Sequence, residues 1–145
     1  MALIYKVTLS GKFAFLDTFD YFCSKVNIVI KIGSSLTVVG ISKTEYKFDV
    51  YSISNFDDID FDADGGVYIF TRRYDDNGKY RHHIIYCGKT NDLSSRFNNH
   101  HKEKDIIKHH ANCICVKIVS TENERDKIEK DILEGNNFPC NDQLN

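Results

Sequence analysis

The chain has 145 residues, a length that suits one domain or a compact domain with an appendage. Its 41% hydrophobic and 12% aromatic content supports a packed core, and no apolar run approaches the roughly 20 residues that span a bilayer. The net charge of −2 argues against a nucleic-acid partner, yet the segment from Arg72 to Lys108 carries nine Lys or Arg and five acidic residues. Such a local field permits phosphate binding without predicting it.

Cysteine usage bears on the cellular compartment. The five cysteines are an odd number, and only Cys113 and Cys115 lie close together in the sequence. This pattern fits reduced thiols better than a disulfide framework. The N-terminal segment also lacks the charged and apolar regions of a signal peptide. We therefore expect a cytoplasmic protein with no membrane segment.

The N-terminal third predicts a small βαββ unit. Apolar residues recur at helical spacing in Phe13–Lys25, after a break at Gly11. Alternating or β-branched residues predict strands around this helix, two of them joined as a hairpin at Gly33-Ser34-Ser35; the strand segments are Ala2–Leu9, Val26–Ile32, Leu36–Ile41 and Tyr46–Ile53. We interpret residues 1–54 as a unit for targeting or assembly that carries no chemistry of its own.

Residues 55–64 are strongly acidic, with five aspartates in ten residues. Alternating aspartates are typical of calcium loops, but this segment lacks the central glycine and the closing glutamate of an EF-hand. We therefore expect an acidic linker that Phe56, Ile59 and Phe61 attach to the body.

Gly66–Gly88 predicts a β-hairpin, because the β-rich runs Val67–Thr71 and Tyr80–Cys87 flank a turn signal. A two-residue turn would place Tyr68 and Tyr86 on opposite faces of the sheet. A three-residue loop, Asp76-Asn77-Gly78 with Gly78 left-handed, would pair the two tyrosines directly on one face. We predict the three-residue loop.

A helix is predicted after this hairpin, with Asn91 or Asp92 as its N-cap. Leu93 and Phe97 would face the core. Arg96 and His100 would share a neighbouring face, one turn apart.

Residues 112–119 alternate as a strand that places Cys113 and Cys115 on one face. The two cysteines and the nearby histidine pairs can be drawn as a zinc site. We favour buried or half-exposed thiols, which are the default for two cysteines on one face of such a strand.

Thr121 and Glu124 form a capping box that opens a last helix, which should end at about Glu134. Its apolar stripe is formed by Ile128, Ile132 and Leu133, and Asp131 is expected on the solvated side. Glu129 lies on the inward flank, where it is either a buried salt-bridge partner, for example of Arg96, or a metal ligand.

Several of these residues together resemble the GIY-YIG nuclease family. Gly66-Val67-Tyr68 and Tyr86-Cys87-Gly88 are similar to the two halves of the family name, with Val67 and Cys87 in place of its isoleucines. The other similar positions are Arg96, His100, Glu129, Pro139 and Asn141. The resemblance covers residues 66–141 and implies an α+β fold, in which a small central antiparallel sheet is flanked by helices and preceded by the N-terminal unit.

The resemblance also implies roles for individual residues in a nuclease domain at 65–145. Glu129 would hold one Mg²⁺ or Mn²⁺ per active site, and Arg96 would bind the phosphate. Tyr68 would orient or deprotonate the attacking water, Tyr86 would bind the water or a phosphate oxygen, and Lys89 would favour the phenolate. His100 could also serve as the base. Gly66, Gly88 and Asn141 would support the site.

The implied activity is metal-dependent endonucleolytic cleavage of DNA. Two alternatives remain open: an RNA-directed nuclease, or a non-catalytic nucleic-acid or protein-binding module on a nuclease scaffold. A homodimer or a partner protein would assemble through residues 1–64.

Overall fold

The computed structural model describes residues 8–9, 12–13 and 29–142. Its centre is an antiparallel five-stranded sheet with the strand order β3-β4-β7-β5-β6. The strands are β3 (Ile30–Val39), β4 (Glu45–Ser52), β5 (Gly66–Asp76), β6 (Lys79–Thr90) and β7 (Cys113–Ile118). A 3-10 turn, η1 (Phe56–Asp58), and two helices, α1 (Glu103–Lys108) and α2 (Glu122–Gly135), complete the main body. The predicted α+β class is confirmed.

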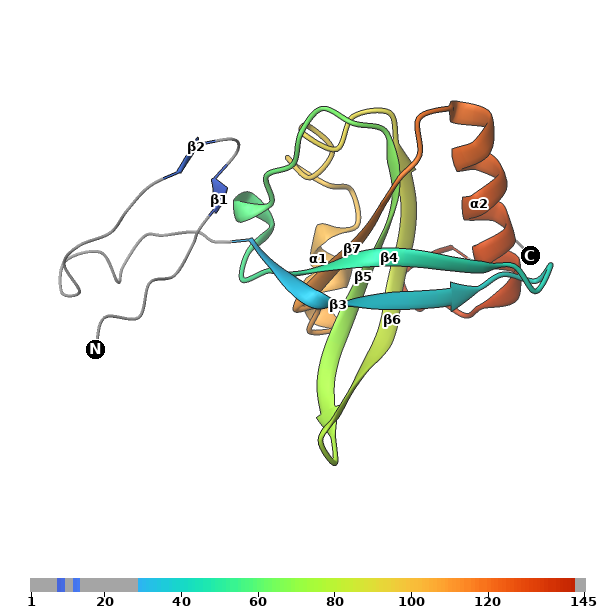
Figure 1. Cartoon of the computed structure of the whole chain (residues 1–145), viewed down its shortest axis with the longest axis horizontal. Helices are drawn as coiled ribbons and strands as arrows, with labels where there is room; N and C mark the ends of the chain where they lie inside the picture. Colours follow the sequence, from blue (N-terminus) through green and yellow to red (C-terminus); the bar gives the residue numbers. More distant parts are fainter. Residues whose placement is uncertain (1–7, 10–11, 14–28, 143–145) are drawn as a thin grey trace, which may run out of the picture.

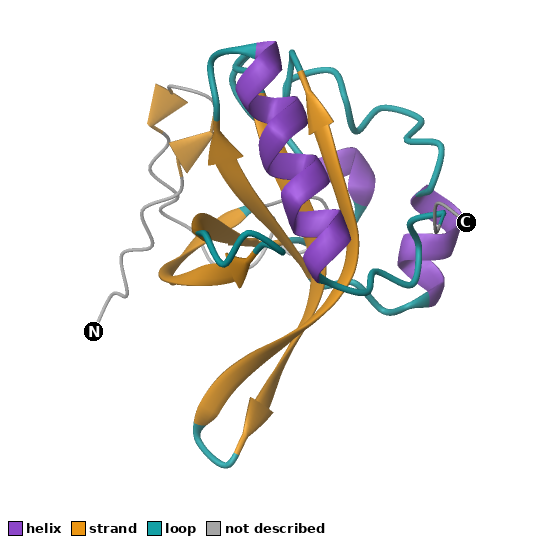
Figure 2. Ribbon diagram, turned by 90° about the vertical axis from the view of Figure 1, so that its right-hand side faces the viewer, coloured by secondary structure: helices purple, strands orange, loops and turns teal. Residues whose placement is uncertain are grey.

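Each face of this sheet is covered by a separate hydrophobic cluster. Along β5, Val67 and Ile69 face α2, whereas Tyr68 and Phe70 face η1, α1 and the segment before α1. In Figure 1, α2 lies to the right of β5 and β6, and Figure 2 shows α2 against the strands. Because both faces are buried, β5 is apolar at consecutive positions and does not alternate.

The N-terminal hairpin differs from the prediction. Residues 33–35 do not form a turn, because β3 runs through them with a bulge between Ile32 and Ser35, and both of its halves pair with β4. The chain reverses instead between Val39 and Glu45, where Val39 pairs with Glu45. The predicted strand at Tyr46–Ile53 is confirmed as β4.

Little of the chain before β3 can be compared with the prediction. Two short strands, β1 (Thr8–Leu9) and β2 (Lys12–Phe13), pair with each other. The predicted helix lies outside the described residues apart from Phe13, and so does most of the first predicted strand.

The β3–β4 hairpin is fixed to α2 through Asp131, which the sequence had assigned to the solvated side. Its carboxylate accepts hydrogen bonds from the Tyr46 hydroxyl at 2.8 Å, from the Ser42 hydroxyl at 2.7 Å and from the Ser42 N–H at 3.0 Å. β4 and β5, the strands on either side of residues 55–64, therefore belong to one sheet, and α2 packs against that sheet.

The acidic segment is attached to the body as predicted. Phe56 and Ile59 are buried, and Phe61 packs against the same cluster. The Phe56 ring stacks on that of Phe70 with 4.8 Å between centroids. The aromatic residues of this segment thus close the face of the sheet opposite α2.

The β5–β6 hairpin has a two-residue turn, so the predicted three-residue loop is wrong. Asp76 pairs with Lys79, and Asn77 and Gly78 have positive φ values of 53° and 84°, as in a type I′ turn. One extra residue on β6, Ile85, then shifts the register, because Thr71 pairs with Ile84 but Phe70 pairs with Tyr86.

This bulge returns Tyr68 and Tyr86 to one face of the sheet, which the two-residue turn alone would have prevented. Tyr68 lies opposite Gly88 and not opposite Tyr86 as predicted, but the two tyrosines still point to the same face. The Ile85 carbonyl accepts a hydrogen bond from the Cys140 N–H at 3.0 Å. The C-terminal segment therefore stabilises the bulge.

Four cysteines, Cys87, Cys113, Cys115 and Cys140, are free and buried. Cys113 and Cys115 share one hydrophobic cluster, as the predicted strand requires. Among the described residues, no helix has the length and apolar character needed to cross a membrane.

Asn141 joins the C-terminal segment to the outer edge of β6. Its side chain accepts from the Cys87 N–H and donates to the Cys87 carbonyl, each at 2.8 Å. Cys87 is fully buried, so these two backbone groups have no access to water.

Replacing Asn141 by alanine should therefore lower the free energy of unfolding by about 1–3 kcal/mol, because two buried backbone groups lose their partners. Urea denaturation measures the loss. Asn98→Ala, at an exposed position, is the matched control and should be nearly neutral. Equal stabilities of the two variants would contradict this role for Asn141.

Candidate active site

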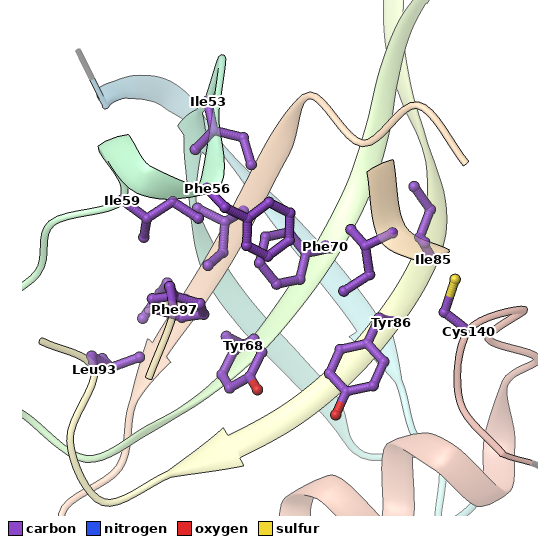
Figure 3. Close-up of a cluster of buried hydrophobic side chains, with 13 residues drawn as sticks. Ile53, Phe56, Ile59, Tyr68, Phe70, Ile85, Tyr86, Leu93, Phe97 and Cys140 are labelled. Carbon is purple, nitrogen blue, oxygen red and sulfur yellow. The ribbon is translucent and has the colours of Figure 1, made fainter. Parts of the chain in front are cut away.

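Tyr68 and Tyr86 lie side by side on β5 and β6, with 6.1 Å between ring centroids. Figure 3 shows both phenol oxygens pointing the same way, away from Phe56 and Phe70. The rings are buried in the core, with 0% and 6% exposure. The pair is thus part of the hydrophobic core and also presents two hydroxyls at its edge.

Gly88 makes room for both phenols. A Cβ at this position would lie 2.6 Å from the Tyr68 hydroxyl oxygen and 2.9 Å from a ring carbon of Tyr86. Gly66 is also confined, because a Cβ there would lie 2.8 Å from the Lys117 carbonyl on β7. Both glycines are therefore required by close packing in the site and the sheet.

The segment that carries Arg96 and His100 is a series of turns, and the predicted helix is absent. Asp92 does cap it, since its carboxylate accepts from the Ser94 N–H at 2.9 Å. Leu93 and Phe97 are buried as predicted, but Asn99 takes a left-handed φ of 54°, and the regular helix that follows the hairpin begins only at Glu103. The left-handed residue turns the chain so that His100 points into the core.

Arg96 and His100 both reach the Tyr68 oxygen. Arg96 donates from Nε at 3.0 Å, and His100 Nε2 lies 2.9 Å away. The second ring nitrogen of His100, Nδ1, accepts the Lys102 N–H at 3.1 Å. In neutral His100 the proton is therefore on Nε2, and the imidazole donates to Tyr68.

Burial dominates the electrostatics of these groups. It raises the pKa of Tyr68 above the ordinary value of 10, with Tyr86 adding to the rise and Arg96 opposing it. Burial together with the charges of Arg96 and His101 lowers the pKa of His100 to about 4. At neutral pH both side chains are uncharged, and Arg96 supplies the positive charge.

A second group of charges lies on the α2 side of the sheet. Lys89 contacts the Asp126 carboxylate and lies 3.5 Å from that of Glu129. The Glu129 side chain is only 21% exposed, which confirms its predicted inward position on the helix that Thr121 caps. Burial raises the pKa of Glu129, and the Lys89 ammonium opposes the rise.

The two groups act on each other electrostatically. After burial, the two charges that shift the pKa of Tyr86 most are Arg96, which lowers it, and Glu129, which raises it. The Arg96 charge likewise lowers the pKa of Glu129. Arg96 is thus a long-range partner of Glu129, and the direct ion pair of Glu129 is with Lys89.

In the described part of the chain, no cluster of three or more His, Cys, Asp or Glu side chains is placed to hold a metal ion. Glu129 and Asp126, however, meet around one cation, the Lys89 ammonium. Mg²⁺ commonly uses one or two protein carboxylates and keeps several waters. The donors at this position therefore fit such an ion.

Three contributors were missed by the sequence analysis. Asp126 lies three residues before Glu129 on the predicted helix, so helical spacing alone could have pointed to it. His101 stacks on His100 with 4.8 Å between centroids, and the Lys102 N–H selects the His100 tautomer. These last two depend on the irregular path between Asn99 and α1, which has no sequence signature.

Residues 64–141 match the GIY-YIG catalytic domain, and the match covers more than half of the 145 residues. The chain therefore belongs to the GIY-YIG family, as the resemblance of its motifs had indicated, and its catalytic domain implies nuclease-type activity. Comparison with curated proteins and with solved structures gives no match.

Gly88→Ala should destabilise the protein by about 1–3 kcal/mol, because the added Cβ forces two buried rings to move. Gly33→Ala is the matched control, since a Cβ on this strand glycine meets nothing within 4 Å. Urea denaturation of both variants measures the difference. The close-packing role of Gly88 is wrong if the two variants are equally stable.

His100 should make stability depend on pH. Its pKa is about 4 in the folded protein and near 6.5 in the unfolded chain, so between these values the unfolded state binds more protons. Stability from the neutral imidazole is complete above pH 6.5 and decreases as the pH falls towards 4, by about 3 kcal/mol in total.

Urea denaturation at several pH values measures this dependence. In His100→Asn the pH-dependent part should disappear, whereas His110→Asn, at an exposed position, should retain it. A His100→Asn variant with the wild-type pH dependence would show that His100 is protonated equally in both states.

Proposed function

We propose that this protein is a metal-dependent endonuclease that hydrolyses phosphodiester bonds in DNA. The observation that carries the proposal is the convergence of Arg96 and His100 on the Tyr68 oxygen. Glu129, which pairs with Lys89, lies within electrostatic range of the neighbouring Tyr86 phenol. This combination provides a cation, hydrogen-bond donors and a carboxylate near the two phenols.

In the proposed reaction, a water oxygen bonds to phosphorus as the bond to the 3′ oxygen breaks. The water loses a proton, the leaving oxygen gains one, and negative charge builds up on the phosphoryl oxygens. The site must therefore hold the phosphate, orient the water and stabilise charge.

Tyr68 is the residue that we place at the attacking water. Arg96 and His100 already donate to both lone pairs of its oxygen, so the neutral phenol is left with its own proton to donate. The same two donors stabilise negative charge if the phenol ionises and accepts the proton of the water. Burial raises the pKa of Tyr68, so these donors oppose a real energetic cost.

His100 is a positioning residue in this scheme. Its Nδ1 is occupied by the Lys102 N–H, and its Nε2 proton points at Tyr68. No lone pair of the imidazole is therefore directed at a water. Its role is to hold Tyr68 and to stabilise charge on the phenol oxygen.

Arg96 and Tyr86 are the proposed phosphate-binding groups. The Nε–H of Arg96 is used by Tyr68, and the terminal nitrogens of its planar guanidinium suit two oxygens of one phosphate. Tyr86 presents its hydroxyl beside that of Tyr68 and donates to the water or to a phosphate oxygen.

Glu129 is the proposed ligand of a divalent ion, with Asp126 beside it on α2. When bound, such an ion supplies positive charge for the phosphoryl and leaving oxygens. Lys89 now neutralises these carboxylates, and it would be free to approach the phenols once an ion replaced it.

Two further proposals concern the whole chain. The buried free thiols support a reducing, cytoplasmic location. Residues 1–54 are proposed to serve targeting or assembly, including a homodimer or a partner protein.

Glu129→Gln should reduce DNA cleavage by about 10³-fold or more, since it removes the charged ligand without changing side-chain size. Nicking of supercoiled DNA with Mg²⁺ measures the rate, and circular dichroism verifies the fold. Glu122→Gln, exposed on the same helix, should cleave normally. Cleavage that is undiminished in EDTA, or in Glu129→Gln, would refute the metal-dependent mechanism.

A further inference from the structure

The end of the β5–β6 hairpin projects from the body as a two-stranded ribbon, which we call the hairpin arm (residues 72–83; Figures 1 and 2). The neighbouring strand β7 pairs with β5 only as far as Thr71. Asn112 then binds the Arg73 backbone through its side chain, at 2.6 and 2.9 Å. Beyond this point only β6 pairs with β5. From Arg72 to Asp76 the arm spans about 14 Å, at about 3.4 Å per residue.

The register connects one face of the arm to the active site. β5 has no bulge, so Arg72, Tyr74 and Asp76 follow Tyr68 and Phe70 on the same side of the strand. Their partners on β6 are His83, Arg81 and Lys79. The bulge at Ile85 allows both strands to present the active-site tyrosines and these arm residues on one face, which we call the site face of the arm.

The site face carries excess positive charge. Arg72, Lys79 and Arg81 are exposed on it, against one acid, Asp76, which pairs with Arg81 at 2.5 Å. Within the described residues, no acidic side chain forms an ion pair with Arg72 or Lys79. The other acid of the arm, Asp75, lies on the opposite face, where it accepts the Gly78 N–H at 2.7 Å.

The aromatic residues give the arm a defined shape. On the site face, Tyr74 and His83 stack with 4.5 Å between centroids and an interplanar angle of 15°. On the opposite face, the Arg73 guanidinium lies over the Tyr80 ring at 3.6 Å from its centroid, so this cation is used within the arm. The unpaired cations are therefore concentrated on the face that continues from the active site.

We infer that the hairpin arm enters the major groove of duplex DNA beside the bond to be cut, with Arg72 and Lys79 against backbone phosphates. A two-stranded ribbon fits the major groove of B-form DNA, which is about 12 Å wide and 8.5 Å deep. The major groove of A-form RNA is narrow and deep and does not admit such a ribbon. The inference rests on the proposed function and specifies duplex DNA as its substrate.

The test is the binding of a fluorescent DNA duplex in EDTA, measured by anisotropy over a range of salt concentrations. Arg72→Ala/Lys79→Ala should weaken binding about tenfold or more and lower the slope of log K against log salt by about 2, one for each lost phosphate contact. Lys47→Ala/Lys127→Ala removes the same charge from exposed positions outside the arm and should bind as the wild type does.

A duplex RNA of the same sequence provides the second comparison. The arm variant should lose affinity for DNA and change little for RNA. Equal losses for the two duplexes, or equal losses in the arm and control variants, would overturn groove binding by the arm.

Binding in EDTA needs neither metal nor turnover. The proposed nuclease activity and DNA binding by the hairpin arm can therefore fail separately. Wild-type protein that binds through the arm but does not nick DNA with Mg²⁺ refutes the proposed activity alone. Wild-type protein that nicks DNA while the arm variant binds normally refutes the arm alone.

Discussion

One extra residue in β6 determines whether the two tyrosines can act together. The two-residue turn at Asn77 and Gly78 would place Tyr68 and Tyr86 on opposite faces, and the bulge at Ile85 reverses that outcome. The bulge is held from outside the sheet by two hydrogen bonds to the C-terminal segment. The Ile85 carbonyl accepts the Cys140 N–H, and the Cys87 N–H on the same strand donates to the Asn141 side chain. The C-terminal residues thus contribute to the site through the register of a strand.

The sequence predicts the hairpin and the shared face of the tyrosines, but not the way this face is achieved. Asn77-Gly78 is the strongest signal for a two-residue turn. The three-residue loop is the alternative that aligns the tyrosines without a bulge. The bulge at Ile85 has no signal in the sequence, because Ile84 and Ile85 are both apolar and each packs in a core. Ile84 packs on the α2 side, whereas Ile85 packs with Tyr86. When both faces of a sheet are buried, hydrophobicity no longer reports the register.

The rest of the site is also predictable only where packing imposes a regular pattern on the sequence. Leu93, Phe97 and the inward flank of α2 were predictable because a core or a helix imposes a period on the sequence. Arg96 and His100 are spaced as on a helix. A series of turns that ends at the left-handed Asn99 nevertheless brings them to Tyr68. The Lys102 N–H, which fixes the His100 tautomer, is a backbone group that no side-chain pattern reveals. The family resemblance points to Arg96 and His100, whereas their hydrogen bonds are visible only in the folded structure.

The resulting site is built into the hydrophobic core. Tyr68 is fully buried, and a buried hydroxyl without partners would cost the protein stability. Arg96 and His100 remove this cost by donating to it, and Gly88 leaves room for the phenol. The groups proposed to stabilise charge on the phenol during hydrolysis are therefore the ones that satisfy it in the resting protein. Folding alone positions them before substrate arrives, which is the condition for donors that act without reorganisation.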